Sequence, residues 1–394
     1  MVSAAPASLG AFSAVWFCYF AAIGLYNPYA PLWFKELGYS TLAIGAIASA
    51  ISWTRVVAPY GWGWFGDRSG QRSRGVRWAA GLSVAAAGGL WLWPDPAALP
   101  VFAVLLFLAN GGVVPLSEAA LSQQLQRGGL LDYARYGRVR LWGSLGFVVS
   151  VAAAGAVFER WGIRHFAMLV LAAFVLLWWA TLRLPEAAAV NADDTPAPPV
   201  RSVLRRPAVA WFFGGVSLTV LAHTALYAFF SLYLNEQGHG SGVVGLAWGV
   251  AVGVEIVFFW AQGRIFDRLS PIGWLQLAAV VAALRFALTA AFGGSLALLL
   301  LAQTLHAVSF AAQHAACIAM VHRFFPGRLR GRGQALYSVL GYGLPGVLGG
   351  VAGGWIGERF GFTAVFWAAA GVAMLAWAAL RRAERALAQE PTAS

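Results

Sequence analysis

Apolar residues fill this chain in long runs that short polar segments separate. Twelve such runs can be marked, over residues 9–33, 42–65, 76–93, 99–121, 141–158, 166–182, 209–233, 243–260, 273–292, 296–321, 335–356 and 362–380. An α-helix needs roughly 20 apolar residues to cross the hydrocarbon core of a bilayer, and it satisfies all its backbone polar groups internally. We therefore predict an all-α membrane protein with twelve transmembrane helices.

Composition excludes a water-soluble globule, because 60% of the 394 residues are hydrophobic and only 11% are charged. The mean hydropathy is +0.69. The two cysteines, Cys18 and Cys317, both fall inside apolar runs, so neither a disulfide framework nor a cysteine-rich metal site is indicated. We expect no cofactor and no bound metal.

The formal charge of +12 follows the predicted topology. Arginines gather after every even-numbered run and at the C-terminal end, whereas the opposite loops hold only Lys35, Arg160, Arg164 and Arg359. The positive-inside rule then places both termini in the cytoplasm. We expect a monomer in a bacterial inner membrane, with the lipid bilayer as its surroundings and no nucleic acid as a partner.

The two halves of the chain repeat each other. A shift of 200 positions pairs Glu36 with Glu236, Gly38 with Gly238, Gly45 with Gly245, Gly63 with Gly263, Asp67 with Asp267 and Arg68 with Arg268. The segment 191–199 is rich in Asp, Ala and Pro and is typical of a linker. We predict six-helix bundles over residues 1–183 and 207–394, joined by a cytoplasmic linker over 184–206. Such duplication is common in secondary transporters, whose solute site lies near the bilayer midplane between the halves.

Five ionisable residues fall in or near the predicted membrane interior: Arg55, Glu118, Arg140, Glu255 and Arg285. A charge at mid-membrane costs at least ~2.5 kcal/mol, so each is a functional candidate with a partner to be found. Arg55 and Glu255 are repeat mates, which suggests an ion pair across a central cavity. The alternative is a purely structural salt bridge between packed helices.

Polar residues also mark two other helices. Gln303, His306, Gln313 and His314 fall within an arc of about 100° on the run 296–321, which predicts one polar stripe facing the cavity. Histidine titrates near neutral pH, so His306 or His314 can carry a proton, as can Glu255; a merely hydrogen-bonded core histidine is the alternative. His223 and Tyr227 share one face of their helix and can hydrogen-bond a solute.

The motif G-x-x-x-D-R occurs twice, from Gly63 and from Gly263, each directly after an apolar run. The first copy, GWFGDRSGQR, resembles the loop signature of the major facilitator superfamily. That resemblance implies a cytoplasmic gating role for charged residues of the two loops: Asp67, Arg68, Arg72, Asp267 and Arg268. A solvated turn with positive-inside arginines is the alternative.

The whole chain resembles the lactose permease branch of that superfamily, most closely its 3-phenylpropionate transporter group of proton symporters. The matching pieces are YNPYAPLWF from Tyr26, PLSEA around Glu118, YGRVRLWGS around Arg140, ALRF around Arg285 and QTLH ending at His306. The resemblance implies that Glu118, Arg140 and Glu255 contact the solute and that Arg285 and His306 take part in proton coupling. We add Tyr26, Arg55, His223 and Tyr227 as candidate solute contacts.

Two departures bear on the solute. The permease pattern Lys-x-x-His-x-x-Glu is replaced by Gln303, His306 and Ser309, so the principal proton-carrying carboxylate is missing. Arg55 is foreign to sugar permeases but fits the phenylpropionate group, and three arginines against two carboxylates favour a monocarboxylate.

We therefore predict a secondary active transporter that moves a small anionic or polar solute by alternating access, coupled to protons, with an aromatic monocarboxylate as the leading substrate. The alternatives are a sugar or nucleoside symporter, an exporter or uniporter, and a non-transporting sensor. An enzyme is disfavoured because no H-E-x-x-H, G-x-S-x-G or cysteine-rich site is present. An ATP-driven pump is disfavoured because Lys35, the one lysine, lies outside any phosphate-binding loop.

Overall fold

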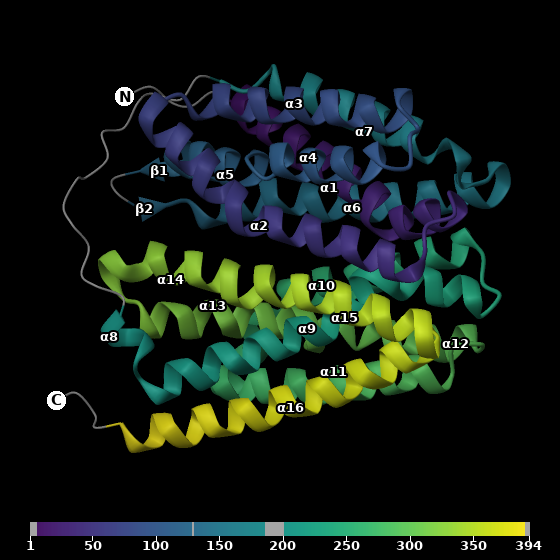
Figure 1. Ribbon diagram of the computed structural model, residues 1–394. Helices are drawn as coiled ribbons and strands as arrows, with labels where there is room; N and C mark the ends of the chain where they lie inside the picture. Colours follow the sequence, from purple (N-terminus) through teal and green to yellow (C-terminus); the bar gives the residue numbers. More distant parts are fainter. Residues whose placement is uncertain (1–5, 128–129, 186–200, 391–394) are drawn as a thin grey trace. The chain divides into compact units, whose positions relative to one another are not determined.

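The computed structural model describes residues 6–127, 130–185 and 201–390, which are helical apart from one short hairpin (Figure 1). The first part of the chain forms α1 (Pro6–Glu36), α2 (Thr41–Ser69), α3 (Arg72–Leu92), α4 (Ala98–Asn110), α5 (Val113–Leu125), β1 (Gln126–Arg127), β2 (Leu130–Leu131), α6 (Tyr133–Trp161), η1 (Ile163–His165) and α7 (Phe166–Thr181). The later part forms α8 (Arg201–Leu204), α9 (Pro207–Glu236), α10 (Ser241–Ile265), η2 (Phe266–Arg268), α11 (Pro271–Ala291), α12 (Leu296–Thr304), η3 (Ala307–Ala312), α13 (Gln313–Phe324), η4 (Gly327–Leu329), α14 (Arg330–Leu336), η5 (Tyr337–Gly343), α15 (Leu344–Phe360) and α16 (Phe362–Gln389).

The all-α membrane fold class is confirmed. Within the described residues, 11 helical segments are long and apolar enough to cross a membrane. The predicted third span corresponds to α3, which has 21 residues but carries Arg72, Arg74 and Arg77 in its first turns. Those arginines and the many small residues of α3 make it less apolar than the eleven segments. Its length and composition alone therefore do not mark it as a membrane span.

Three of the predicted spans are interrupted helices. The fourth breaks at Gly111 and Gly112 between α4 and α5. The tenth and eleventh each contain a π-helical segment, η3 and η5 respectively. Such i→i+5 turns are rare and occur frequently at functional sites, so the polar residues near these two segments are functional candidates.

The predicted repeat is visible in how α1 and α9 end. Gly38 and Gly238 have φ angles of 87° and 81°, a left-handed conformation that glycine adopts without steric cost. In both copies the next amide closes the same turn, since Tyr39 N donates to Phe34 O at 3.1 Å and His239 N donates to Leu234 O at 2.9 Å. These are the bonds of a Schellman C-cap, and they stop both helices at equivalent places.

Contacts divide the chain into two compact units. The first unit comprises Met1–Tyr39, Trp53–Asp194 and Ser241–Leu246, and the second comprises Ser40–Ser52, Thr195–Gly240 and Ala247–Ser394. These units differ from the predicted halves at the starts of α2 and α10, and the predicted bounds of the two bundles stay a prediction. Most of the predicted linker, including 191–199, lies outside the described residues.

In the first unit, α1 packs along α6 and α7, and α3 packs on α4 and α7. Glycine makes the approach of α1 to α6 possible. A Cβ added at Gly146 would lie against the backbone of Phe17, and one at Gly24 would lie against Phe147 and Ser150. Small residues that let two backbones approach closely are a common device of membrane helices.

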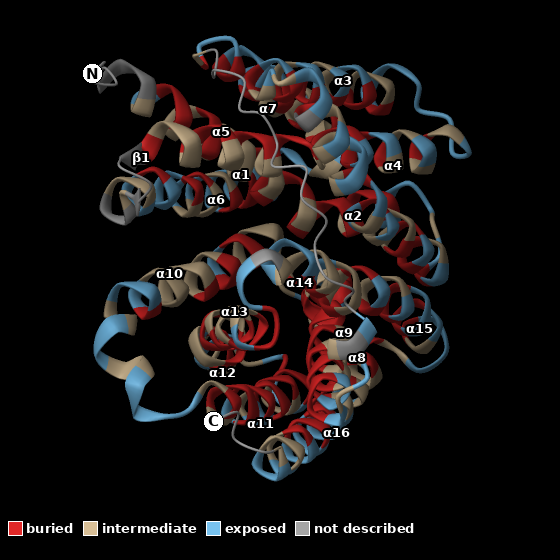
Figure 2. Ribbon diagram, turned by 90° about the vertical axis from the view of Figure 1, so that its left-hand side faces the viewer, coloured by how far each residue is buried: buried red, intermediate tan, exposed pale blue. Residues whose placement is uncertain are grey.

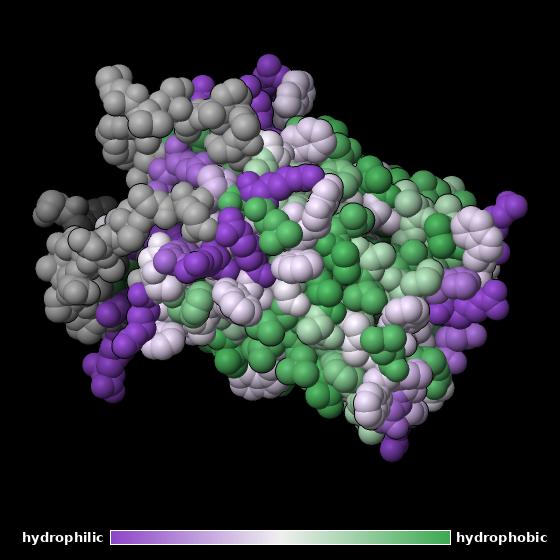
Figure 3. Space-filling model, turned by 90° about the horizontal axis from the view of Figure 1, so that it is seen from above, coloured by the Kyte–Doolittle hydropathy of each residue, from purple (hydrophilic) through white to green (hydrophobic). Residues whose placement is uncertain are grey.

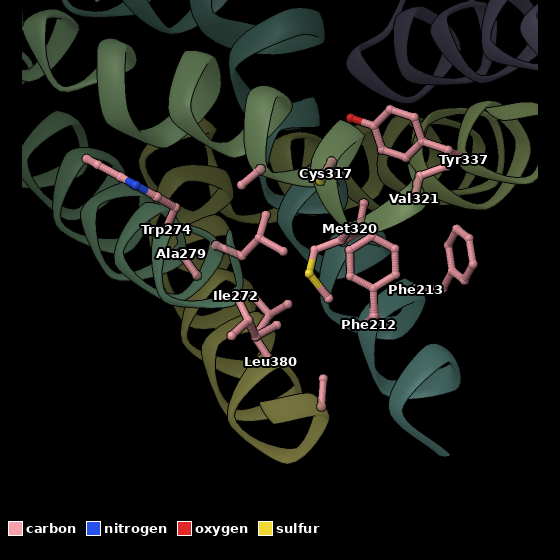
Figure 4. Close-up of a cluster of buried hydrophobic side chains, with 14 of the residues drawn as sticks. Phe212, Phe213, Ile272, Trp274, Ala279, Cys317, Met320, Val321, Tyr337 and Leu380 are labelled. Atoms are coloured by element: carbon pink, nitrogen blue, oxygen red, sulfur yellow. The ribbon is translucent and has the colours of Figure 1, made fainter. Parts of the chain in front are cut away.

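In the second unit, α16 packs along both α9 and α11, and these two helices carry long buried stretches (Figure 2). Proline and serine set where the helices begin: Pro271 occupies the first turn of α11, and the Ser270 side chain accepts from Gly273 N. The apolar core of this unit joins Phe212, Ile272, Met320 and Leu380 from four helices (Figure 4).

The surface pattern agrees with a membrane environment. On the face seen in Figure 3, apolar side chains cover the middle, and hydrophilic side chains gather toward the two ends. Large apolar residues are exposed on most of the described spans, for example Trp260 at 77% and Leu375 at 60%. Lipid tails solvate such side chains without the cost that water would impose.

Candidate transport sites

Two arginines of the first unit share an aromatic surrounding. The Arg140 guanidinium of α6 lies over the Trp16 ring of α1, 4.9 Å from its centroid. Arg140 and Arg55 of α2 both interact electrostatically with the Tyr19 phenol, so the two positive charges lie in the same region of this unit. Phe20 joins the group, stacked on Trp16 with centroids 5.7 Å apart and edge-on to Tyr19 at 5.0 Å. A cation with rings beside it can receive a carboxylate that carries an aromatic group.

Glu118 is held by a residue that the sequence reasoning missed. The Tyr136 hydroxyl of α6 donates to Glu118 Oε1 of α5 at 2.5 Å. Arg140 lies one helical turn further along α6 and interacts electrostatically with Tyr136. Tyr136 belongs to the YGRVRLWGS match, which is the signal that could have identified it.

Tyr26 is a packed core residue in this structure. It is 2% exposed, and its ring lies 4.9 Å from that of Phe107 and 5.6 Å from that of Phe166. Its hydroxyl has no hydrogen-bond partner among the described residues. A buried hydroxyl without a partner is energetically costly, and a polar group of a solute could satisfy it. The solute contact of Tyr26 stays a prediction.

The second unit holds a buried arginine at its polar centre. Arg285 of α11 has no exposed surface. Its Nη2 donates to Gln303 Oε1 at 2.6 Å, and its Nη1 donates to His306 Nδ1 at 2.7 Å and to Ser309 Oγ at 3.4 Å. The predicted coupling residues Arg285 and His306 are therefore in direct contact, and the two positions that depart from the permease pattern, Gln303 and Ser309, complete the same group.

Glu255 of α10 reaches this group through His306. Its Oε2 lies 3.6 Å from His306 Nε2, which is within ion-pair range and beyond an ordinary hydrogen bond. The Glu255 side chain keeps 19% of its surface exposed, whereas that of His306 keeps 2%. Of the predicted coupling residues, three thus lie together: Glu255, Arg285 and His306.

His223 and Tyr227 of α9 border the same cluster. His223 is 3% exposed, its Nδ1 lies 2.8 Å from Thr219 O, and its Nε2 has no partner among the described residues. Tyr227 stacks on Trp248, with ring centroids 5.9 Å apart, and interacts electrostatically with Arg285. Their predicted role as solute contacts stays a prediction.

The predicted polar stripe of the tenth span divides into separate contacts. Gln303 and His306 face Arg285, Gln313 Nε2 donates to Cys317 Sγ at 3.4 Å, and His314 Nδ1 lies 3.3 Å from the Tyr337 hydroxyl. The π-helical segment η3 lies between the two histidines, and its wider turn changes the facing of the residues that follow. The rings of His306 and Phe310 stack at 4.8 Å.

The predicted gating residues lie at the end of α2, at the start of α3 and in η2, directly after α10. Arg68 is exposed and lies 5.4 Å from the ring centroid of Trp64; Arg72 Nη1 lies 3.5 Å from Gln123 Oε1; Asp267 and Arg268 are exposed in η2. The side chain of Asp67 lies outside the described residues. The gating role stays a prediction.

Arg55 belongs to the first unit and Glu255 to the second, so their predicted ion pair stays a prediction too. No group of three His, Cys, Asp or Glu side chains in the described part of the chain is placed to hold a metal ion.

Comparison with known families identifies the architecture. The model of the MFS_1 like family matches residues 9–368. The chain belongs to the MFS_1 like family. This member of the major facilitator superfamily is therefore a multi-pass membrane transporter of small molecules and not an enzyme, and the predicted family and fold are confirmed.

Curated relatives of this MFS_1 like protein differ in their solutes. It is 28% identical over 377 residues to the probable 3-phenylpropionic acid transporter of Escherichia coli K12, covering 91% of this chain and 93% of the relative. It is 29% identical over 363 residues to the maltose permease of Geobacillus stearothermophilus, covering 90% and 89%. Among solved structures, the nucleoside transporter NupG shares the fold with a TM-score of 0.82 at 16% identity, over 96% of this chain and 99% of NupG.

Proposed function

We propose that this transporter is a proton symporter for aromatic monocarboxylates. The observation that carries the proposal is the arginine pair of the first unit, Arg55 and Arg140, which act on one phenol, Tyr19, among stacked aromatic rings. A carboxylate on a small aromatic molecule matches both the charge and the rings. The relative named as a probable 3-phenylpropionic acid transporter supports this choice of substrate class.

Each polar cluster then has a distinct task. In the first unit, Arg140 and Arg55 attract the anion, while Glu118, held by Tyr136, balances part of their charge. In the second unit, Glu255, His306 and Arg285 couple a proton to the anion's movement. Tyr227 and His223 line the same polar region of the second unit and supply further solute contacts. His314, hydrogen-bonded among tyrosines, is the remaining candidate for proton transfer.

The setting follows from the arginine distribution and from the fold. We place the protein in a bacterial inner membrane as a monomer, and the positive-inside rule favours both termini in the cytoplasm. Alternating access of a midplane site, with the charged loops after α2 and α10 acting as the cytoplasmic gate, is the transport mechanism that fits a duplicated fold. The direction of the proton gradient makes uptake the favoured direction.

Transport by purified protein in proteoliposomes tests the proposal. Labelled 3-phenylpropionate should accumulate when the outside is acidic, and a protonophore should abolish the accumulation. Unlabelled aromatic carboxylates should compete, and maltose and uridine should not. A tracer displaced by maltose or uridine but not by carboxylates would establish the sugar or nucleoside alternative, which the maltose permease relative motivates.

A matched pair of substitutions on α6 tests the anion site. Arg140→Gln should lower uptake by about tenfold or more, since a charge-assisted contact to a carboxylate contributes about 1.5–3 kcal/mol. Arg160→Gln is the control, because Arg160 lies on the same helix and over an indole ring in the same way, 5.7 Å from the Trp161 centroid. Equal losses in both variants would contradict a specific role for Arg140.

A further inference from the structure

The buried guanidinium of Arg285 is balanced indirectly. Within the described part of the chain, its hydrogen bonds go to uncharged acceptors on Gln303, His306 and Ser309. Arginine remains protonated in proteins, and an uncompensated charge in a low-dielectric interior is strongly unfavourable. The carboxylate that contacts this group is that of Glu255, which faces the far nitrogen of the His306 ring. One imidazole therefore stands between a fixed positive charge and a carboxylate.

The geometry fixes the protonation state of His306. Nη1 of Arg285 can only donate, so the His306 Nδ1 at 2.7 Å must accept, and the ring proton is on Nε2, toward Glu255. A second proton on His306 would turn Nδ1 into a donor aimed at another donor. It would also place two positive charges side by side where water is excluded. His306 is thus a poor place to load a proton.

We propose that Glu255 carries the coupled proton and that His306 is a positioning residue, neutral throughout, which links Glu255 to Arg285. This assignment rests on the proposed proton symport. From α9, His223 and Tyr227 also interact electrostatically with the cluster. His223 is 3% exposed and its Nδ1 already contacts Thr219 O, so a second ring proton would add a positive charge near that of Arg285, as it would on His306.

Two other titratable residues are less suited to the task. Glu118 belongs to the first unit and accepts the Tyr136 hydrogen bond. His314 lies with two phenols, 3.3 Å from the Tyr337 hydroxyl and 3.4 Å from that of Tyr342. Neither of these contacts involves Arg285.

Charge balance then couples the proton to the substrate. While Glu255 is ionised, its carboxylate offsets the Arg285 charge. When Glu255 takes up a proton, Arg285 lacks a counter-charge and the protein gains affinity for an anion. Linkage requires the converse: a bound anion favours the proton on Glu255 by the same factor. Glu255 thereby replaces the carboxylate that Ser309 lacks on the tenth span.

Substitutions that keep or remove a titrating group separate the two roles. Glu255→Gln should lose gradient-driven accumulation by roughly tenfold or more while still exchanging labelled for unlabelled substrate at equal concentrations, a reaction that needs no net proton movement. His306→Asn should retain accumulation, because an amide oxygen can accept from Arg285 and the amide nitrogen can donate to Glu255. His306→Phe, which can do neither, should lose it. Glu236→Gln, at the exposed end of α9, is the surface control.

The outcomes distinguish this assignment from the proposed function. Adding substrate should make the external medium alkaline with the wild type and with His306→Asn, but not with Glu255→Gln. A pH-sensitive dye follows the change. If His306→Asn loses coupling as completely as Glu255→Gln while its exchange persists, His306 titrates and the assignment fails. It also fails if Glu255→Gln still accumulates substrate. If the wild type moves substrate without protons, the proposed symport itself is wrong.

Discussion

The hydroxyl of Tyr136 donates to the carboxylate of Glu118 at 2.5 Å and also interacts electrostatically with Arg140, one helical turn further along α6. A carboxylate and a guanidinium in the same region attract each other, so a freed Glu118 would compete with an anionic substrate for Arg140. The Arg140 guanidinium instead lies over Trp16, where it keeps donors available to a ligand.

Tyr136→Phe should therefore weaken substrate binding rather than slow the transport step. The expected change is a rise of about fivefold in apparent KM, which corresponds to ~1 kcal/mol. Adding Glu118→Gln should restore KM, because the competing charge is gone. Initial rates of uptake over a range of substrate concentrations measure both variants. Tyr60→Phe, a residue 58% exposed on α2, is the control, and an unchanged KM in Tyr136→Phe would show that Glu118 does not compete.

Much of the fold follows from the sequence, because lipid leaves few alternatives to apolar helices. The turns at Gly38 and Gly238 also follow from the repeat, and the structure gives both the same hydrogen bonds. The π-helical segments could not be predicted, since no residue preference distinguishes Ala307–Ala312 from an ordinary helical run. Because η3 was not predicted, Gln313 and His314 were placed on one stripe with Gln303 and His306. In the structure they contact Cys317 and Tyr337 instead of Arg285.

The site residues were predictable to different degrees. Arg285 and His306 were grouped by family resemblance, and the structure brings them together. Tyr136 was overlooked because a tyrosine near a helix end is usually an interfacial or packing residue, and only its contact with Glu118 gives it a role. The ion pair between Arg55 and Glu255 was inferred from repeat symmetry, and it remains to be tested by experiment.

The contact of α1 with α6 should tolerate no side chain at Gly146. A methyl group there would lie against the Phe17 carbonyl, and backbone atoms cannot move as a flexible side chain can. Gly146→Ala should destabilise the protein by about 1–3 kcal/mol, as overpacking does elsewhere. Gly137→Ala on the same helix is the control, since a Cβ there meets nothing within 4 Å. Thermal unfolding in detergent compares them, and equal midpoints would contradict the tight contact.

The end of α16 is tied to the start of α9 by a pH-sensitive pair. Glu390 accepts hydrogen bonds from Arg206, with Nε and Oε1 3.0 Å apart, and these bonds lower the pKa of the Glu390 carboxyl. A carboxyl whose folded pKa is lowered stabilises the fold above its unfolded pKa, near 4.3 for Glu, and loses that contribution as the pH falls through the folded value. Both side chains are partly exposed, so the contribution is at most about 1 kcal/mol.

Glu390→Gln should therefore lower the unfolding midpoint slightly at neutral pH and make no difference in strong acid. The wild type and the variant are compared across an acid pH series, with Glu36→Gln, at the exposed end of α1, as the control for a surface carboxylate. High salt should reduce the difference at neutral pH, because exposed pairs are screened. A gap between wild type and Glu390→Gln that widened toward acid would have the wrong sign for this mechanism.

The net charge moved per transport cycle distinguishes an anionic from a neutral solute. If one proton enters with each monocarboxylate, on Glu255 as proposed, the loaded carrier moves no net charge, since the two charges cancel. Accumulation in proteoliposomes should then follow the pH gradient and be unaffected by a potassium diffusion potential imposed with valinomycin at constant pH. A symporter of a neutral sugar with a proton would move one positive charge, and its uptake would rise when the inside is made negative. Because a unit charge crossing a full membrane potential is worth ~2.3 kcal/mol per 100 mV, the two cases differ by tens of fold in accumulation and cannot be confused.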